Sequence, residues 1–112
     1  MLHQQVTAAQ LDEYIKRNSI VLVDFSTNWC APCKEFSRIF KEMAEQYPHV
    51  IFAQIDPEVE TELKDIFQVQ SVPFLLIFKE ERVVYAKPGL LSSSAMKEII
   101  EKVIALDIDT IS

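Results

Sequence analysis

The sequence predicts an α/β protein in which helices cover both faces of a central mixed β-sheet. Runs of β-branched and apolar residues alternate, along the first two thirds of the chain, with segments whose apolar residues recur at helical spacing. Near the C-terminus two apolar runs follow each other across a short polar stretch, as in an antiparallel hairpin. Helices between the early strands imply parallel crossovers, and the hairpin adds an antiparallel edge.

The N-terminal half predicts a helix, a strand and a second helix. Thr7 and Gln10 can form a capping box for the first helix, and residues 20–25 form a run typical of a central parallel strand. The second helix is expected to extend from the cysteine pair to the residue before Pro48. Apolar residues mark one face of each helix: Leu11, Tyr14 and Ile15 in the first, and Phe36, Ile39, Phe40, Met43 and Tyr47 in the second.

The C-terminal half predicts a strand over 50–55, a helix, a hairpin and a last helix. The hairpin strands are 74–78 and 83–86, separated by the polar KEER, and Ser92 can cap the last helix. The apolar stripes of these two helices are Val59, Leu63, Ile66 and Phe67, and Met96, Ile99, Ile100, Val103 and Ile104. Residues 106–112 carry no strong pattern, and we expect a loose tail there.

Size and charge limit the class of protein. A chain of 112 residues, 49% of them apolar, can bury one core, so we expect a single domain spanning 1–112. The net charge of -6 argues against nucleic acid and anionic membranes as partners. The sequence has no run near the roughly 20 apolar residues of a membrane span and no signal-peptide pattern at its start. We therefore expect a cytoplasmic monomer.

The two cysteines of the chain, Cys30 and Cys33, are separated by two residues. Pro32 suits the first turn of a helix, which places Cys30 at a helix N-terminus, where a thiolate is stabilised. Residues three apart in a helical turn come close enough for a disulfide after modest adjustment. The pair therefore predicts thiol–disulfide exchange, in which Cys30 attacks and Cys33 resolves the mixed disulfide.

Two other interpretations of the pair stay open. A zinc site needs four ligands, and the chain adds only His3 and His49, so dimerisation would have to complete a site made of cysteines. The cysteines could also be inert core residues. The inert-core interpretation does not account for Trp29, Pro32 and Lys34 around the pair.

Asp24 lies inside the predicted strand, six residues before Cys30. A buried carboxylate with few hydrogen bonds has a raised pKa and can act as a base near neutral pH. The alternative is an aspartate satisfied by backbone N–H groups at a strand end. The offset from the cysteine pair favours the functional role.

Four segments, VLVDF, WCAPCK, VPFLLIFK and PGLL, resemble those of the thioredoxin family in order and spacing. The resemblance covers about residues 6–103. It implies a central sheet wrapped by four helices and a protein that reduces protein disulfides with its own two cysteines. It also implies that Asp24, beneath Cys33, takes up a proton, that no metal or organic cofactor is needed, and that a reductase of the thioredoxin-reductase type regenerates the dithiol.

The resemblance further implies a surface that binds disulfide-containing proteins. Val72 and Pro73 match the family's cis-proline pair, whose backbone binds substrate as an added strand. Trp29 matches an exposed tryptophan, and Gly89 a glycine that lets a partner's backbone approach. From the residues alone, a trans proline, a core tryptophan and a loop glycine remain open. The expected surface comprises Trp29, Ala31, Pro32, Val72, Pro73 and Gly89.

Several positions depart from the family pattern. Ala31 replaces the usual glycine between the cysteines, which should change the redox potential modestly. Phe74 replaces a threonine, either as an exposed contact or as a core residue. Gln54 replaces a lysine, so Asp24 should be harder to ionise. Glu80 and Glu81 replace Asn-Gly, and a tight turn with positive φ is therefore not expected in the hairpin.

Three alternative functions are compatible with these departures. One is a specialised exchanger: an oxidant, an isomerase or the reductant of a dedicated partner. Another is a binding module that uses the same fold without redox chemistry, although such a scaffold has no need of either thiol. The third is the zinc-linked dimer, which would lose its assembly in the presence of a chelator.

Overall fold

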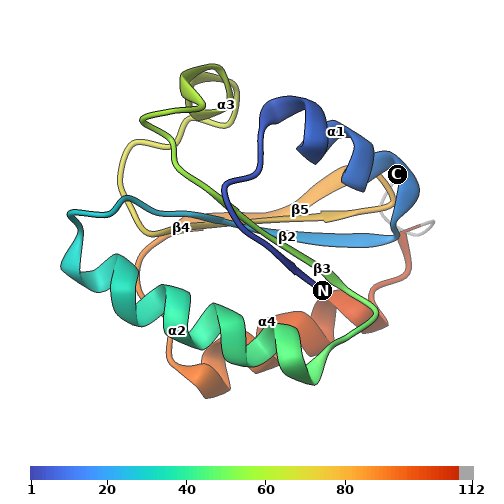
Figure 1. The fold of residues 1–112 in the computed structure, drawn as a ribbon. Coiled ribbons are helices and arrows are strands. Elements are labelled where there is room, and N and C mark those ends of the chain that lie inside the picture. Colours follow the sequence, from blue (N-terminus) through green and yellow to red (C-terminus); the bar gives the residue numbers. More distant parts are fainter. Residues whose placement is uncertain (109–112) are drawn as a thin grey trace.

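The computed structural model describes residues 1–108, which form a five-stranded sheet and four helices (Figure 1). The strand order is β1-β3-β2-β4-β5, with β1, β3 and β2 parallel and β4 and β5 antiparallel to their neighbours. The elements are β1 (Leu2–His3), α1 (Ala8–Arg17), β2 (Ile20–Phe25), α2 (Ala31–Gln46), β3 (Ile51–Ile55), α3 (Thr61–Ile66), β4 (Phe74–Lys79), β5 (Arg82–Pro88) and α4 (Ser93–Ala105). The predicted α/β fold with a mixed sheet and four helices is confirmed.

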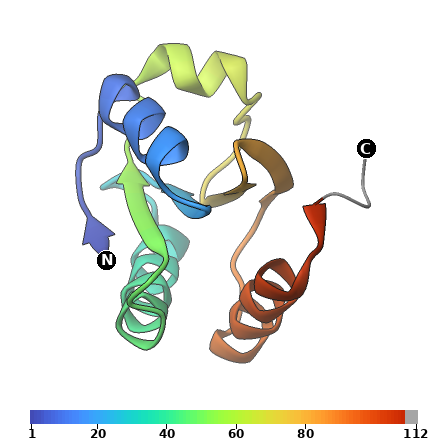
Figure 2. The same cartoon turned by 90° about the vertical axis from the view of Figure 1, so that its right-hand side faces the viewer.

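The helices form a layer on each face of the sheet. Helices α2 and α4 lie side by side on one face, and α1 and α3 cover the other (Figures 1 and 2). Alternate residues of β2 enter the two cores, because successive side chains of a strand point to opposite faces. Leu22 packs in the core beneath α2 and α4, whereas Val21, Val23 and Phe25 pack on the α1 and α3 side. The same alternation turns Asp24 towards α2.

The sequence analysis missed one strand and overstated one helix. Strand β1 is only two residues long and pairs with β3 through Leu2 opposite Phe52, too short for an apolar alternation to be detected. Helix α3 buries Leu63 but leaves Ile66 largely exposed, and Val59, which precedes the helix, is largely exposed as well. The predicted apolar stripe there is therefore wrong at these two positions.

The hairpin turn between β4 and β5 also corrects an expectation. Lys79 pairs with Arg82, so the loop has two residues, and Glu80 and Glu81 have φ of 49° and 67°. Positive φ at both positions is what a type I′ turn requires, and its twist matches that of the flanking strands. Glu80 is held by Ser19, whose carbonyl accepts from the Glu80 N–H at 2.8 Å and whose hydroxyl donates to the Glu80 carboxylate at 2.6 Å. The tertiary structure thus imposes a turn that the residue types disfavour.

Lys79 anchors the end of α4 to the sheet. Its side chain is buried, and Nζ donates to the carbonyl oxygens of Val103, Ile104 and Leu106 at 2.6, 2.9 and 2.6 Å. The last carbonyls of a helix lack the usual intrahelical donor, and of these three the Val103 carbonyl also accepts from the Leu106 N–H at 3.2 Å. Part of the expected loose tail, residues 109–112, lies outside the described residues, while Leu106 is tied to the sheet by this contact.

Within residues 1–108, none of the helices has the length and apolar character needed to cross a membrane.

Replacing Glu81 by glycine should stabilise the protein. Left-handed backbone costs a residue with a Cβ about 1–2 kcal/mol, and the greater freedom of glycine in the unfolded chain offsets about half of that gain. We expect Glu81→Gly to raise the free energy of unfolding by about 0.5–1 kcal/mol in urea denaturation. Glu81→Ala is the matched control, because it removes the charge but keeps the Cβ. An equal gain in both variants would assign the effect to charge.

Lys79→Met should destabilise the protein, because it keeps the buried chain but removes the ammonium that donates to three carbonyl oxygens at the end of α4. The expected loss is about 2 kcal/mol of unfolding free energy in urea, without a change in thiol chemistry. Lys97→Met, at an exposed position of α4, is the control for loss of a positive charge. Equal effects of the two substitutions would contradict an anchoring role for Lys79.

Candidate active site

The cysteine pair lies where β2 leads into α2. Cys30 is the N-cap of the helix, and its Sγ accepts a hydrogen bond from the Cys33 N–H at 3.2 Å. Pro32 occupies the first turn, where a missing N–H costs nothing. The two cysteines form a disulfide with their Cα atoms 5.2 Å apart, within the usual range. The predicted helix start and pairing are both present.

The two sulfurs are in different surroundings. Cys30 is 6% exposed to solvent and Cys33 only 1%, so Cys30 is the more accessible of the two. Sγ of Cys30 lies 3.8 Å from the carbonyl oxygen of Val72, and the Val72–Pro73 peptide bond is cis, as expected. Gly89 donates its N–H to the carbonyl oxygen of Pro73 at 2.8 Å. The Val72–Pro73 segment thus contacts Cys30 through Val72 and Gly89 through Pro73, and within it Val72 is half-buried and Pro73 buried.

Exposed residues surround the pair. Trp29 is 71% exposed, and its indole N–H donates to the carboxylate of Glu58 at 2.8 Å. Ala31 and Pro32 are exposed as well. Gly89 has a φ of +113°, and a Cβ placed on it would meet no atom within 4 Å. Its backbone conformation itself favours glycine, and the space beside it is open.

Phe74 is buried at 6% exposure and packs edge-to-face on Phe25, with ring centroids 6.2 Å apart. Of the two alternatives left open for this aromatic residue, the core role is the correct one. Its replacement of a smaller residue therefore adds to the core on the α1 and α3 side and leaves the rim beside Pro73 unchanged in character.

Asp24 is completely buried, and three side chains donate hydrogen bonds to it. Ser26 Oγ donates to Oδ1, while Ser37 Oγ and Gln54 Nε2 donate to Oδ2 at 3.1 and 3.2 Å. The expectation of a poorly hydrogen-bonded carboxylate is therefore wrong. The alternative with backbone donors is wrong too, since every hydrogen bond recorded for this carboxylate comes from a side chain.

Burial nevertheless raises the pKa of Asp24 above its usual value. Loss of solvation is the largest cause, and it outweighs the hydrogen bonds from Ser26, Gln54 and Ser37 together with the attraction of Lys41. All three donors are neutral, so they favour the charged carboxylate less than a cation in contact would. The sequence predicted a raised pKa from burial together with poor hydrogen bonding. The pKa of Asp24 is raised, and burial is the cause.

Sequence reasoning missed the contributions of Ser26 and Ser37. A weak signal was available: Ser37 lies four residues after Cys33, on the same face of α2, and Ser26 lies two residues after Asp24 along the strand direction. Contact between these residues depends on how α2 packs across β2, which spacing alone does not give.

A surface hollow of about 890 Å³ connects this network to solvent. Its lining includes Asp24, Ser26, Cys33, Ser37 and Gln54, with Lys41 also among the lining residues. The buried cysteine and the buried carboxylate thus border the same hollow. Thr27, whose buried hydroxyl has no hydrogen-bond partner among the described residues, also lines this hollow.

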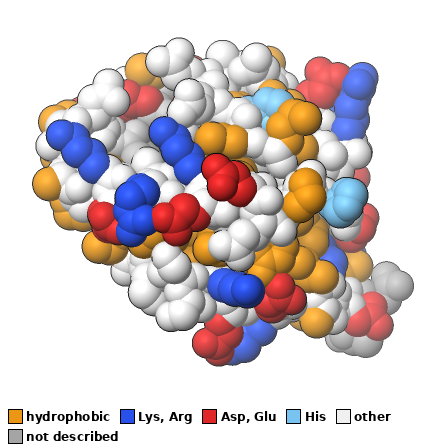
Figure 3. Space-filling model, turned by 60° about the horizontal axis from the view of Figure 1, so that its bottom comes forward, with side chains coloured by type: hydrophobic (Ala, Val, Ile, Leu, Met, Phe, Trp, Pro, Cys, Tyr) orange, Lys and Arg blue, Asp and Glu red, His pale blue; other side chains and the backbone are white. Residues whose placement is uncertain are grey.

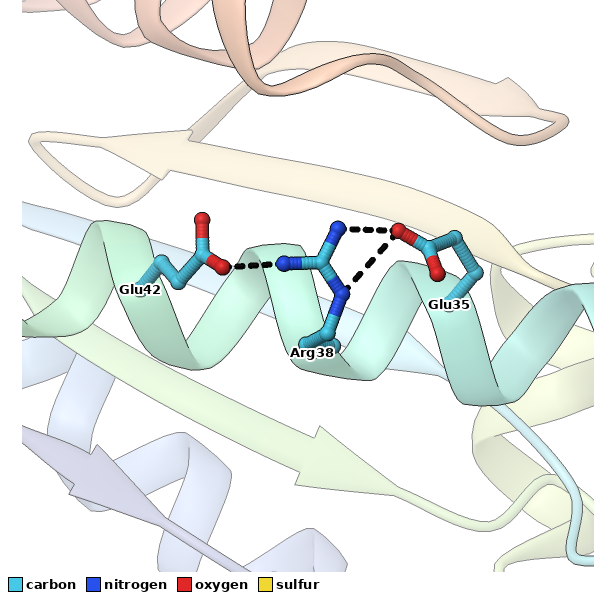
Figure 4. A network of polar contacts seen from close by, with 3 residues as sticks. All are labelled: Glu35, Arg38 and Glu42. Atoms are coloured by element: carbon cyan, nitrogen blue, oxygen red, sulfur yellow. Dashed lines mark hydrogen bonds and ion pairs between the residues drawn. The ribbon is translucent and has the colours of Figure 1, made fainter.

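The outer face of α2 carries paired charges. Arg38 reaches both Glu35 and Glu42, one turn away on either side (Figure 4). The side of the molecule that bears α2 and α4 has basic and acidic side chains interspersed (Figure 3). Arg38 thus directs its charge along the helix surface, and Lys41 is the cation that acts on Asp24. Within 1–108 no three His, Cys, Asp or Glu side chains are grouped as metal ligands.

Comparison with known proteins finds sequence matches that span most of this chain. The family model described as Thioredoxin matches residues 3–102. A putative thioredoxin 2 of Streptomyces coelicolor is 35% identical over 107 residues, covering 96% of this chain and 80% of that protein. Thioredoxin-1 of Saccharomyces cerevisiae is 36% identical over 103 residues, covering 89% of this chain and 96% of that protein.

Structural comparison agrees with the sequence matches. A mutant thioredoxin from Halobacterium salinarum aligns with a TM-score of 0.87 at 29% identity, and the alignment covers 95% of this chain and 93% of that one. The similarity extends over nearly the whole fold and is not confined to the cysteine motif. The chain therefore belongs to the thioredoxin family and is a thiol–disulfide oxidoreductase.

Proposed function

We propose that this protein works in the reducing direction, donating electrons from Cys30 and Cys33 to disulfides of other proteins in the cytoplasm. The observation that carries the proposal is the asymmetry of the pair. Cys30 caps a helix at the accessible rim, whereas Cys33 is buried and lines the same hollow as Asp24. One sulfur is suited to meet a substrate, and the other to act after it.

The reaction proceeds in two exchanges. The Cys30 thiolate attacks one sulfur of the substrate disulfide, and the second substrate sulfur leaves as a thiolate, which water protonates. Cys33 then attacks Sγ of Cys30, the Cys30–Cys33 disulfide forms, and the substrate sulfur bonded to Cys30 leaves as a thiolate, which water protonates. The proton of the Cys33 thiol passes to Asp24, whose pKa is raised by burial, so that it binds a proton more readily than an exposed aspartate does. Two electrons move from the dithiol to the substrate.

The substrate binds across the rim around Cys30. The carbonyl of Val72, close to Sγ of Cys30, is available to a substrate segment that adds as a strand. Trp29 offers an exposed aromatic surface beside it, and the open space at Gly89 admits a backbone. Ala31 and Pro32 complete this surface, which selects substrates mainly by backbone geometry.

The cycle needs an external electron donor. Because each turnover leaves the Cys30–Cys33 disulfide, a reductase of the thioredoxin-reductase type must restore the dithiol. The protein acts as a monomer, and this scheme uses no metal or organic cofactor.

The reduction potential of the Cys30–Cys33 pair tests the direction of exchange. We expect a reduction potential of about -270 mV, as for thioredoxin, when the protein is equilibrated in dithiothreitol and glutathione buffers. A reduction potential of about -180 or -120 mV, as in isomerases and oxidants, would contradict the reducing direction and favour a specialised exchanger.

Two cysteine variants assign the roles of the two sulfurs when each is incubated with a disulfide-containing substrate protein. Cys33→Ser should accumulate a mixed disulfide with a substrate protein through Cys30, and Cys30→Ser should accumulate none. The reverse pattern would exchange the roles of the two cysteines. Retention of the cellular function when both are replaced would favour the binding module.

Asp24→Asn should make the protein more stable and its exchange slower. The folded state holds the Asp24 proton to a higher pH than the unfolded chain, so wild-type stability falls as the pH rises from the unfolded pKa, about 3.9, through the folded pKa. The variant lacks this loss. Its urea midpoint should match the wild type near pH 4 and exceed it at pH 8, while Cys33 attack slows on the order of tenfold or more at pH 7.

The asparagine can keep the observed hydrogen bonds, because its oxygen can accept from Ser37 and Gln54 while its amide donates to Ser26, whose hydroxyl can also accept. Asp56→Asn, at a half-buried position of the same hollow, is the matched control. A stability difference that does not grow with pH, or an unchanged rate of Cys33 attack, would contradict the proton-accepting role.

A further inference from the structure

The two oxygens of the buried Asp24 carboxylate have different hydrogen-bond partners. Oδ2 accepts from two donors, Ser37 Oγ at 3.1 Å and Gln54 Nε2 at 3.2 Å, whereas Oδ1 accepts from Ser26 alone. A carboxylate oxygen has two in-plane lone pairs. Both lone pairs of Oδ2 are therefore engaged, and one lone pair of Oδ1 remains for a proton.

The donors to Oδ2 come from two different elements. Ser37 belongs to α2 and lies one turn after Cys33, so the helix that carries the resolving cysteine also holds the carboxylate. Gln54 is the direct neighbour of Asp24 in the β2–β3 register. Together they fix the carboxylate between the helix and the sheet, and a rotation of Asp24 would break both bonds.

We propose that Ser37 and Gln54 are positioning residues that keep Oδ2 as a permanent acceptor and thereby direct the proton from Cys33 to Oδ1. The proposal rests on the proton-accepting role of Asp24 proposed above. Ser26 supports both states of the carboxylate: its hydroxyl donates to the charged Oδ1 and turns to accept from the protonated one. The amide nitrogen of Gln54 can only donate, so it has no such second role.

The proton balance is complete within this network. Cys33 loses a proton as its sulfur attacks Cys30, and Asp24 changes from carboxylate to carboxylic acid without any change in oxidation state. When the product has left, Oδ1 returns the proton through the half-buried Ser26 to water in the hollow. No other reactant is needed.

Charged side chains of two neighbouring elements line the hollow beside the network. Helix α2 contributes Lys34, Arg38 and Lys41 to the hollow, and the segment after β3 contributes Asp56 and Glu60. Of these, Lys41 acts on the pKa of Asp24. On the other side of β2, the register partner in β4 is the apolar Leu75. The immediate partners of Asp24 are thus neutral donors.

The test compares serine and glutamine variants by the pH profile of the Cys33 step. Stopped-flow measurement of mixed-disulfide resolution would be combined with carboxyl-carbon NMR titration of Asp24 in the reduced protein. Ser37→Ala and Gln54→Leu each remove a bond that favours the charged carboxylate. Both midpoints should move upward by about one pH unit. Ser26→Ala should move them less than half as far, since its bond serves both charge states.

Controls separate positioning from general structural damage. Ser94→Ala, at an exposed position of α4, should leave the profile unchanged. Ser37→Thr, which keeps a hydroxyl at this position, should have a midpoint closer to the wild type than Ser37→Ala has. In an Asp24→Asn background, Ser37→Ala should have no further effect on the rate. Gln54→Leu tests the same oxygen independently if Ser37→Ala does not fold.

The outcomes distinguish this inference from the function it rests on. If Asp24→Asn leaves the Cys33 step unchanged, the proton-accepting role itself fails. If Asp24→Asn slows the step but Ser37→Ala and Gln54→Leu keep the wild-type midpoint, only the positioning role is overturned. A larger shift in Ser26→Ala than in Ser37→Ala would overturn it as well, because the proton would then be carried on Oδ2.

Discussion

The burial of β2 between β3 and β4 is the constraint on which the site depends. With neighbours on both edges and helices on both faces, each residue of this strand except its first is buried, including the charged Asp24. Strand alternation sends Asp24 to the α2 side, directly into the layer that carries the cysteine pair. A carboxylate in that place is costly for stability, and the three side-chain donors reduce the cost without removing it.

The same strand also determines where the reactive sulfur lies. Because β2 ends at Phe25 and α2 begins at Ala31, the loop between them delivers Cys30 to the helix N-terminus. Backbone N–H groups and the helix dipole then favour a thiolate there, while Val72 and Gly89 approach from two other loops. The sheet, rather than any single contact, brings Cys30, the Val72–Pro73 backbone and the buried Asp24 into one region.

Local sequence preferences and the tertiary structure disagree at two places, and the tertiary structure prevails at both. Glu80 and Glu81 adopt left-handed backbone because the paired ends of β4 and β5 leave room for only two residues. Lys79 is buried although lysine is normally exposed, since three carbonyl oxygens at the end of α4 replace its water. In each case the energy of a local rule is smaller than that of strand pairing and helix docking.

The sequence by itself determined the α/β class, the start of α2 at the cysteines and the placement of Asp24 in a buried strand, because apolar periodicity and proline restrictions act over a few neighbouring residues. It did not reveal β1, the shortness of α3, or the donors Ser26 and Ser37 to Asp24, and it placed Gln54 near Asp24 only through the family resemblance. Those depend on side chains from three elements meeting across the packed interface of α2 with the sheet. Only the tertiary structure decides such contacts, since packing brings together residues whose distance in sequence carries no signal.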